Sequence, residues 1–204
     1  MSLRVVVLAS GAGTNLQAIL DELHGGPEGV VVVGVAGDRP GAPALERAAA
    51  AGVATAVFPR DAFPDRAARD AALAAQVQAW EADLVVLAGY MALLDPGFTR
   101  RFAGRIVNVH PSLLPVFPGL RAIEQAIAYG VKVAGVTVHL VDDGIDTGAI
   151  LLQDAVAVAD DETAASLHDR LRPLEHALLC RAVRAFAADG VSADPDNPRR
   201  MRVT

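Results

Sequence analysis

An asparagine and a histidine stand two positions apart at the start of NVHPSLLPVFPG, residues 108–119, directly after an apolar run. Residues two apart in a β-strand point to the same side, so a strand over residues 105–109 places Asn108 and His110 on one face at its carboxyl end. An amide and an imidazole can both donate to a developing oxyanion, and the imidazole can also move a proton. The alternative is a buried Asn–His pair that satisfies loop carbonyls.

Three prolines follow within eight residues, at Pro111, Pro115 and Pro118. A residue that precedes proline is pushed into extended backbone, so Pro111 prolongs the strand geometry through His110. The other two prolines restrict the following loop and reduce its entropy. The tight, proline-dense turn predicts a cis peptide bond before Pro115 or before Pro118.

A second polar cluster lies in GVTVHLVDDGIDTGAIL, residues 135–151. Its acids are Asp142, Asp143 and Asp146. Acids in loops are mostly solvated turn formers, but Asp146 stands between an apolar residue and a Gly-containing turn. A carboxylate there can pair with His110 and favour its charged form. His139 is better interpreted as a buried, hydrogen-bonded histidine than as a catalytic one.

A glycine-containing turn, SGAGTN at residues 10–15, joins a predicted strand to a predicted helix. Glycines let a ligand approach the backbone closely, and a helix N-terminus offers N–H groups and a positive dipole end, which favours phosphate. The dinucleotide fingerprint GxGxxG fails because Leu16 stands where the third glycine is needed, and the Walker pattern is absent. A single phosphate monoester fits better, although any tight strand-to-helix turn also favours Gly and Asn.

Short apolar runs alternate with Ala-rich helical stretches, and these elements must position the polar residues. The predicted strands are residues 3–9, 30–36, 53–58, 83–88, 105–109, 132–141 and 150–158. The predicted helices are residues 15–23, 42–51, 66–80, 121–129 and 162–188. We expect Pro173 to break or kink the last helix. The β-α-β order predicts a doubly wound α/β fold: a mostly parallel sheet with helices on both faces, an antiparallel C-terminal edge, and ligands at the carboxyl ends of the strands.

The composition is that of one globular domain. With 204 residues, 52% of them hydrophobic, residues 1–190 are expected to form a single domain, followed by a polar tail, residues 191–204, that is extended or disordered. A net charge of −6 disfavours nucleic acid or an anionic membrane as partner. The one cysteine, Cys180, excludes an intramolecular disulfide and a multi-cysteine metal site. Without a membrane-length apolar run or a signal peptide, a cytoplasmic protein is expected.

The two polar stretches resemble the signatures of the folate-dependent formyltransferases. SGAGTNLQAIL near the start, AGYMALL at 88–94 and LEHALL at 174–179 narrow the resemblance to the branch that formylates phosphoribosylglycinamide in purine synthesis. Relatives that formylate methionyl-tRNA carry a second C-terminal domain, which is not expected in this chain. The deformylases carry an N-terminal regulatory domain and usually a second His where Pro111 stands. A deformylase, a sugar-amine formyltransferase and a binding module that kept the fold remain alternatives, whereas Leu16 argues against a nicotinamide oxidoreductase.

The resemblance implies a reaction in which the amine of 5'-phosphoribosylglycinamide attacks the formyl carbon of 10-formyltetrahydrofolate, a co-substrate. Asn108 and His110 are implied to stabilise the tetrahedral oxyanion, with His110 as proton donor, and Asp146 to hold His110 charged and relay the amine's proton. The implied binding residues are Gly13, Thr14 and Asn15 for the phosphoribosyl group, Glu175 for ribose hydroxyls, Met91, Ala92, Leu93, Leu94 and Asn108 for the folate, and Arg66 for its glutamate tail. No metal is expected, and the partners are small molecules, with the chain a monomer or homodimer.

Several positions depart from the commoner family pattern. Val116 replaces a frequent Lys, Arg121 a frequent His, Leu140 a common Phe, and Ala92 an Arg found in some members. These changes alter the charge expected near the folate tail and leave the affinity for that tail open. They do not touch the set formed by Asn108, His110 and Asp146.

Overall fold

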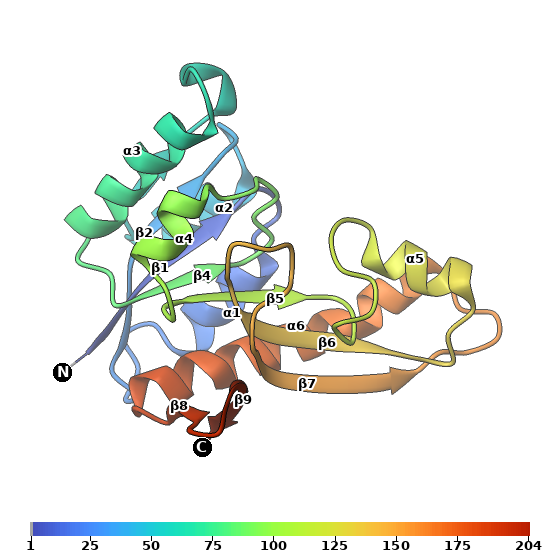
Figure 1. Cartoon of the computed structure of the whole chain (residues 1–204). Coiled ribbons are helices and arrows are strands. Elements are labelled where there is room, and N and C mark those ends of the chain that lie inside the picture. The colour runs from blue at the N-terminus through green and yellow to red at the C-terminus, as the bar shows by residue number, and fades with distance from the viewer. Residues whose placement is uncertain (1) are drawn as a thin grey trace. The chain divides into compact units, whose positions relative to one another are not determined.

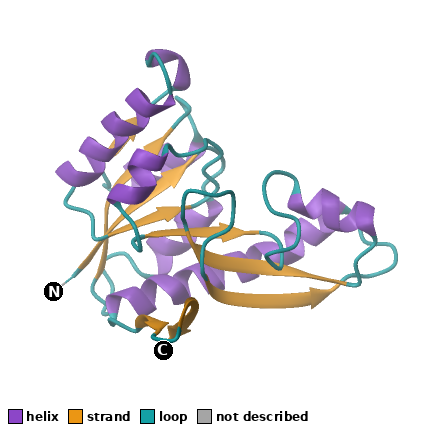
Figure 2. Ribbon diagram, viewed as in Figure 1, coloured by secondary structure: helices purple, strands orange, loops and turns teal. Residues whose placement is uncertain are grey.

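A computed structural model describes residues 2–204 and divides the chain into two compact units, Met1–Asn108 and Val109–Thr204, called the N-terminal and C-terminal units. Figures 1 and 2 show the elements. The strands are β1 (Leu3–Ala9), β2 (Val30–Gly37), β3 (Thr55–Val57), β4 (Leu84–Leu87), β5 (Ile106–His110), β6 (Val133–Leu140), β7 (Ile150–Ala157), β8 (Val191–Asp194) and β9 (Asn197–Val203). The helices are α1 (Thr14–Glu22), α2 (Pro43–Ala50), η1 (Arg60–Ala62), α3 (Arg66–Ala79), α4 (Pro96–Arg101), α5 (Ala122–Tyr129) and α6 (Ala164–Ala187).

The predicted fold class is confirmed. Seven strands form one sheet in the order β3-β2-β1-β4-β5-β6-β7. The pairs among β1 to β5 are parallel, whereas β6 and β7 are antiparallel because no helix separates them in the chain. All the predicted strands and long helices are present, with boundaries within about two residues of those expected, as is usual for helix ends. The short helices η1 and α4 were not predicted.

The strand order of the N-terminal unit creates a natural ligand crevice. The chain steps from β1 outward to β2 and β3, then returns to the other side of β1 as β4 and β5. Because crossovers between parallel strands are right-handed, this reversal puts α1 and α2 on one face and α3 and α4 on the other. Accordingly α1 contacts α2, and α3 contacts α4. The switch lies between β1 and β4, so the turns after these two strands form the expected binding edge.

Helices cover both faces of the N-terminal strands, which explains their unbroken apolar sequence. Val5, Val6 and Val7 are all 0% exposed. Trp80, at the end of α3, lies so close to β2 that a Cβ at Gly34 would fall 2.4 Å from its indole ring. Leu73 and Val77 of the same helix are 1% and 0% exposed, so this face of α3 packs in the core.

In the C-terminal unit, α6 packs against both β6 and β7. Of the two effects expected of Pro173, a break does not occur, because α6 runs unbroken through this residue, and a kink stays a prediction. Proline costs the helix a backbone hydrogen bond, but residues on both sides of it, such as Leu171 and Leu179 at 0% exposure, hold α6 in the core. Tertiary burial thus outweighs the local preference.

Residues 191–204 were expected to be extended or disordered, and the structure shows them extended, as strands β8 and β9. β8 and β9 pair as an antiparallel hairpin, and β9 also contacts β7. Arg202 Nη2 donates to Asp194 Oδ2 at 2.9 Å across the hairpin. These strands were not predicted, because their sequence is polar and contains Pro198 instead of an apolar run. The assignment of residues 1–190 as a single domain stays a prediction.

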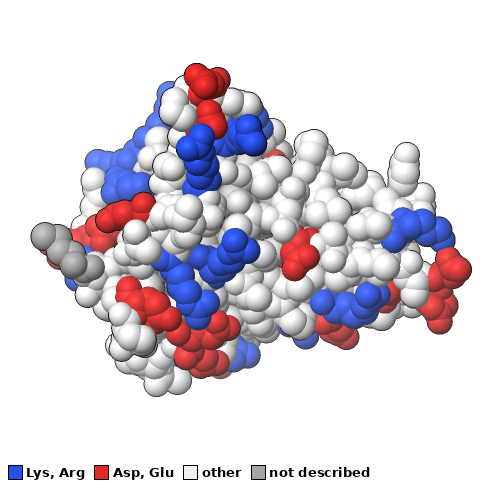
Figure 3. Space-filling model, turned by 90° about the horizontal axis from the view of Figure 1, so that it is seen from below, with Lys and Arg blue, Asp and Glu red and all other residues white. Residues whose placement is uncertain are grey.

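No helix within residues 2–204 is long and apolar enough to span a membrane. On the face drawn in Figure 3, acidic and basic side chains are interspersed, with uncharged surface between them.

Candidate active site

The C-terminal unit brings the two ionisable members of the predicted catalytic set together. Oδ2 of Asp146 lies 3.4 Å from Nδ1 of His110, and both side chains are largely buried. Nε2 of His110 lies 2.9 Å from the carbonyl oxygen of Phe117. A carbonyl can only accept, so Nε2 carries a proton, and the carboxylate beside Nδ1 favours a second one. The geometry therefore suits a charged imidazole.

Asp146 also faces a second histidine. Its Oδ1 lies 3.5 Å from Nε2 of His139, which is 1% exposed and whose Nδ1 lies 2.8 Å from the carbonyl oxygen of Leu140. The prediction that His139 is buried and hydrogen-bonded is confirmed, but its contact with Asp146 was missed. The N–H of Gly119 donates to Oδ2 at 2.7 Å.

These contacts decide the charge of Asp146. Burial alone would raise the pKa of this carboxyl group, but the bond to His139, the Gly119 N–H and the charge of His110 outweigh it and lower the pKa to about 2. Asp146 is therefore ionised at neutral pH and can stabilise a positive charge on His110.

The acids of the loop between β6 and β7 differ in their contacts, and these contacts distinguish a turn-forming acid from the catalytic candidate. Oδ1 of Asp142 accepts from the N–H of Gly144 at 3.0 Å and from Oγ1 of Thr147 at 2.6 Å, so this acid shapes the loop. Asp146 has φ 53°, a left-handed conformation that Asp tolerates better than most residues. A Cβ at Gly148 would lie 1.7 Å from the Leu140 carbonyl oxygen, so only glycine fits there. The turn thus aims Asp146 at the histidines.

Side chains of β6 and β7 hold the loop that follows His110. Thr137, 0% exposed, donates to the carbonyl of Ser112 at 2.6 Å and accepts from the N–H of Leu114 at 3.1 Å. Gln153 donates to the Leu114 carbonyl at 3.0 Å. The peptide bond between Leu114 and Pro115 is cis, which confirms one of the two predicted positions. The loop is stiffened by the network as well as by its prolines.

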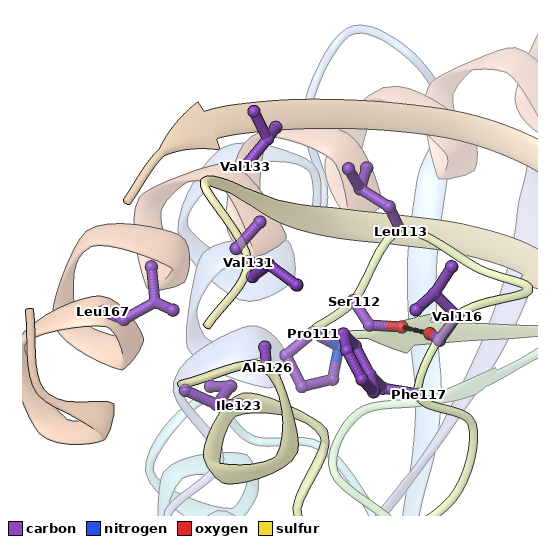
Figure 4. Close-up of a pocket in the computed structure, with 11 residues that line it drawn as sticks. Pro111, Ser112, Leu113, Val116, Phe117, Ile123, Ala126, Val131, Val133 and Leu167 are labelled. Atoms are coloured by element: carbon purple, nitrogen blue, oxygen red, sulfur yellow. Dashed lines mark hydrogen bonds between the residues drawn. The ribbon is translucent and has the colours of Figure 1, made fainter. Parts of the chain in front are cut away.

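An apolar pocket of about 130 Å³ lies beside this loop (Figure 4). Pro111 and Phe117 border it, together with Ile123 of α5. The Ser112 hydroxyl donates to the Val116 carbonyl at 2.6 Å, so its polar atom is satisfied locally. Since the Phe117 carbonyl contacts His110, packing in this pocket also bears on the imidazole.

Asn108 precedes His110 by two residues in β5 and pairs in register with Leu87 of β4. Alternation along a strand turns the side chains of Asn108 and His110 to the same side, as predicted. Glu175 is 7% exposed on α6, in the C-terminal unit.

The predicted phosphate turn caps α1 in the N-terminal unit. Gly13 has φ 73°, and a Cβ on it would lie 2.7 Å from the Cα of Ala44, so the fold itself requires glycine there. A Cβ on Gly11 would meet nothing within 4 Å, which leaves that side of the turn open to a ligand. Sequence reasoning missed Arg47 of α2, whose Nε donates to the Ala12 carbonyl at 2.9 Å and brings positive charge to the turn. Thr14 and Asn15 begin α1.

The predicted folate residues also belong to the N-terminal unit. Arg66 is exposed at the start of α3. Residues 91–94 follow β4, with the side chains of Met91 and Leu93 55% and 56% exposed. The N–H of Met91 donates to the Ser10 hydroxyl at 2.8 Å, which ties the turn after β4 to the turn after β1. Two predicted sites thus share the edge at the switch between these strands. Within residues 2–204, no cluster of three or more His, Cys, Asp or Glu side chains could hold a metal ion.

Comparison with known proteins identifies close relatives. The family model described as formyl transferase matches residues 3–183. The chain is 49% identical, over 93% of its length and 87% of the relative's, to a phosphoribosylglycinamide formyltransferase of Mycobacterium tuberculosis. It is 47% identical to glycinamide ribonucleotide transformylase 1 from Symbiobacterium toebii, with a TM-score of 0.94 over 99% of this chain and 94% of that one. A formyltetrahydrofolate deformylase from Pseudomonas syringae is 28% identical, with a TM-score of 0.90 over 100% of this chain and 66% of that one.

Proposed function

The chain belongs to the formyl transferase family, and on that basis we propose that it transfers the formyl group of 10-formyltetrahydrofolate to the amine of 5'-phosphoribosylglycinamide. The observation that carries the proposal is the ionised Asp146 beside His110, at the end of the strand that bears Asn108. The reaction is a step of purine biosynthesis, the process in the name of a Drosophila melanogaster relative, trifunctional purine biosynthetic protein adenosine-3. We place it in the cytoplasm, with small molecules as its partners.

In the proposed mechanism, the amine attacks the formyl carbon and its carbonyl oxygen gains negative charge. The Asn108 amide donates to that oxygen, a contact worth about 10²–10³ in rate. The two nitrogens of His110 face Asp146 and the Phe117 carbonyl, so the charged imidazole would stabilise the oxyanion through its positive charge. Asp146 keeps His110 charged and takes part in removing the proton of the attacking amine. Collapse of the tetrahedral intermediate breaks the bond to the folate nitrogen, which receives a proton as tetrahydrofolate leaves.

The two substrates would bind at the carboxyl edge of the sheet. The turn at Gly13, Thr14 and Asn15 would hold the phosphate through N–H groups at the start of α1, supported by the positive charge of Arg47. Residues 91–94 would line the pterin pocket, and Arg66 would meet the glutamate tail. Glu175 would accept hydrogen bonds from ribose hydroxyls.

A deformylase is the second candidate, because the similarity to the Pseudomonas syringae structure shows that the fold serves both reactions. The two differ in the acceptor, which is an amine in one case and water in the other. Phosphoribosylglycinamide is therefore the discriminating reagent.

The test is an absorbance assay for folate product, run with both substrates and again with phosphoribosylglycinamide omitted. Formyl transfer predicts turnover only when the amine is present, with formylated phosphoribosylglycinamide formed in equal amount. Turnover at the same rate without the amine would identify a deformylase and reject the proposal.

A further inference from the structure

A buried ion pair on α3 lies next to the loop that follows β4. Arg69 and Asp70 are 4% and 1% exposed, and Nε of the arginine donates to Oδ1 of the aspartate at 2.7 Å. Burial alone would lower the pKa of Arg69, but the bond to Asp70 and nearby negative charge outweigh it and raise that pKa. The arginine is therefore charged within the protein.

Each member of the pair also forms a hydrogen bond with the backbone of residues 91–95. Nη2 of Arg69 donates to the carbonyl of Leu93 at 2.9 Å. Oδ2 of Asp70 accepts from the N–H of Asp95 at 2.6 Å. Together with the bond from the Met91 N–H to Ser10, alternate loop residues are held from inside.

These bonds fix the backbone of the loop after β4, while apolar side chains of the same loop remain exposed. Met91 and Leu93 are each more than half exposed, although the backbone around them is anchored by charge-assisted bonds. A buried ion pair contributes little net stability, since desolvation offsets the attraction, but its bonds are short and directional. Its main effect here is on the conformation of the loop.

We propose that Arg69 and Asp70 are positioning residues for the folate co-substrate, which hold residues 91–95 in the conformation that receives the pterin. The inference rests on the proposed function, in which residues 91–94 line the pterin pocket. A loop ordered in advance lets the ligand bind without first populating a rare conformation, because apparent affinity falls with the fraction of protein that is competent to bind.

The main variant replaces the pair with apolar residues of similar size, Arg69→Met with Asp70→Leu. Such replacements of buried pairs are often neutral for stability, so the fold is expected to persist while the two loop contacts are lost. We expect the Kd for tetrahydrofolate, measured by calorimetry, and the KM for formyl folate to rise about tenfold or more. The KM for phosphoribosylglycinamide and kcat at saturating folate should change by less than about twofold.

Arg4→Met is the matched control. Arg4 also bonds backbone carbonyls, those of Trp80 and Glu81. It lies near the start of β1, whereas Ser10, which bonds the loop, follows the carboxyl end of that strand. Loss of the Arg4 side chain should leave the folate constants unchanged. Asp70→Asn is a second variant that keeps the shape of the side chain and one acceptor, and we expect it to raise the Kd as well. Because it leaves the buried Arg69 charge without its counter-charge, thermal denaturation must first confirm that it is folded.

Hydrogen exchange gives a readout of loop order that does not depend on catalysis. Amides of residues 91–95 should exchange faster in the double variant and in Asp70→Asn than in wild type or Arg4→Met. Provided that wild type catalyses formyl transfer, three outcomes would each overturn the inference. These are equal exchange of residues 91–95 in the double variant and wild type, equal tetrahydrofolate affinity of these two proteins, and an equal loss of affinity in Arg4→Met. Failure of the proposed function looks different, since wild type itself would then show no transfer from formyl folate.

Discussion

Oδ2 of Asp146 lies 3.4 Å from Nδ1 of His110, while the other oxygen of the same carboxylate faces His139 at 3.5 Å. The carboxylate is therefore shared between an imidazole at the end of β5 and one near the end of β6. A single negative charge supports both rings, and its removal should affect chemistry and stability in separable ways.

Asp146→Asn keeps the shape of the side chain but removes its charge. We expect kcat/KM at neutral pH to fall by roughly 10²–10⁴, the range for a general acid–base group. The measurement is kcat/KM against pH, with circular dichroism to confirm folding. Asp142→Asn is the matched control: its amide oxygen can still accept the loop bonds, so activity should persist. Near wild-type activity in folded Asp146→Asn would reduce Asp146 to a turn residue.

Asn108→Ala should act on the oxyanion alone. Loss of one neutral donor is expected to lower kcat by about 10²–10³. The pH profile should stay where it is, since Asn108 does not titrate and Asp146 still supports His110. Steady-state kinetics across the same pH range checks both parts. A shifted profile in this variant would contradict the assignment of Asn108 as a simple donor.

The depressed pKa of Asp146 predicts an acid-dependent loss of stability. Its pKa is about 2 in the folded protein, below the ordinary value of 3.8 for an aspartate. Because the folded pKa is the lower one, the stabilisation is complete above about pH 4 and disappears as pH falls through about 2. A difference of almost two pH units corresponds to about 2 kcal/mol. Urea denaturation between pH 5 and pH 2 should therefore show that wild type loses this much more than Asp146→Asn. Parallel curves would mean that the contacts do not depress the pKa.

The glycine turn offers a test that separates folding from phosphate binding. Gly13→Ala should destabilise the protein by about 1–3 kcal/mol, because it combines a positive φ with a Cβ contact at 2.7 Å to Ala44. Gly13→Val should be worse, so weaker phosphoribosyl binding in that variant would not distinguish a ligand role from strain. Gly11→Val places its side chain in open space and should retain stability.

If the turn binds phosphate, Gly11→Val should weaken phosphoribosylglycinamide binding by about tenfold and leave tetrahydrofolate binding unchanged, since the new side chain occupies the ligand's approach. Thermal denaturation and calorimetry with each ligand give both readouts. Equal losses for the two ligands would mean that the turn was assigned wrongly.

The sequence determined the fold class and brought out the candidate catalytic set, because both depend on local and periodic signals. Buried parallel strands need unbroken apolar runs, and alternation along β5 aligns Asn108 with His110 whatever surrounds them. Proline restricts the residue before it, so the stiff loop and the cis bond before Pro115 were also predictable. Asp146 was distinguished from Asp142 by its neighbours in the turn alone.

Only the tertiary structure decided which partners these residues meet, since partners distant in sequence leave no periodic trace. His139 reaches Asp146 because a bulge and a left-handed turn reorient the chain between β6 and β7. No sequence pattern distinguishes Arg69 and Asp70, yet α3 buries both charges against a loop more than twenty residues further on. Packing likewise carried α6 through Pro173 and paired the polar residues after 190 as a hairpin. For α6 and the hairpin, tertiary contacts outweigh the local sequence preference.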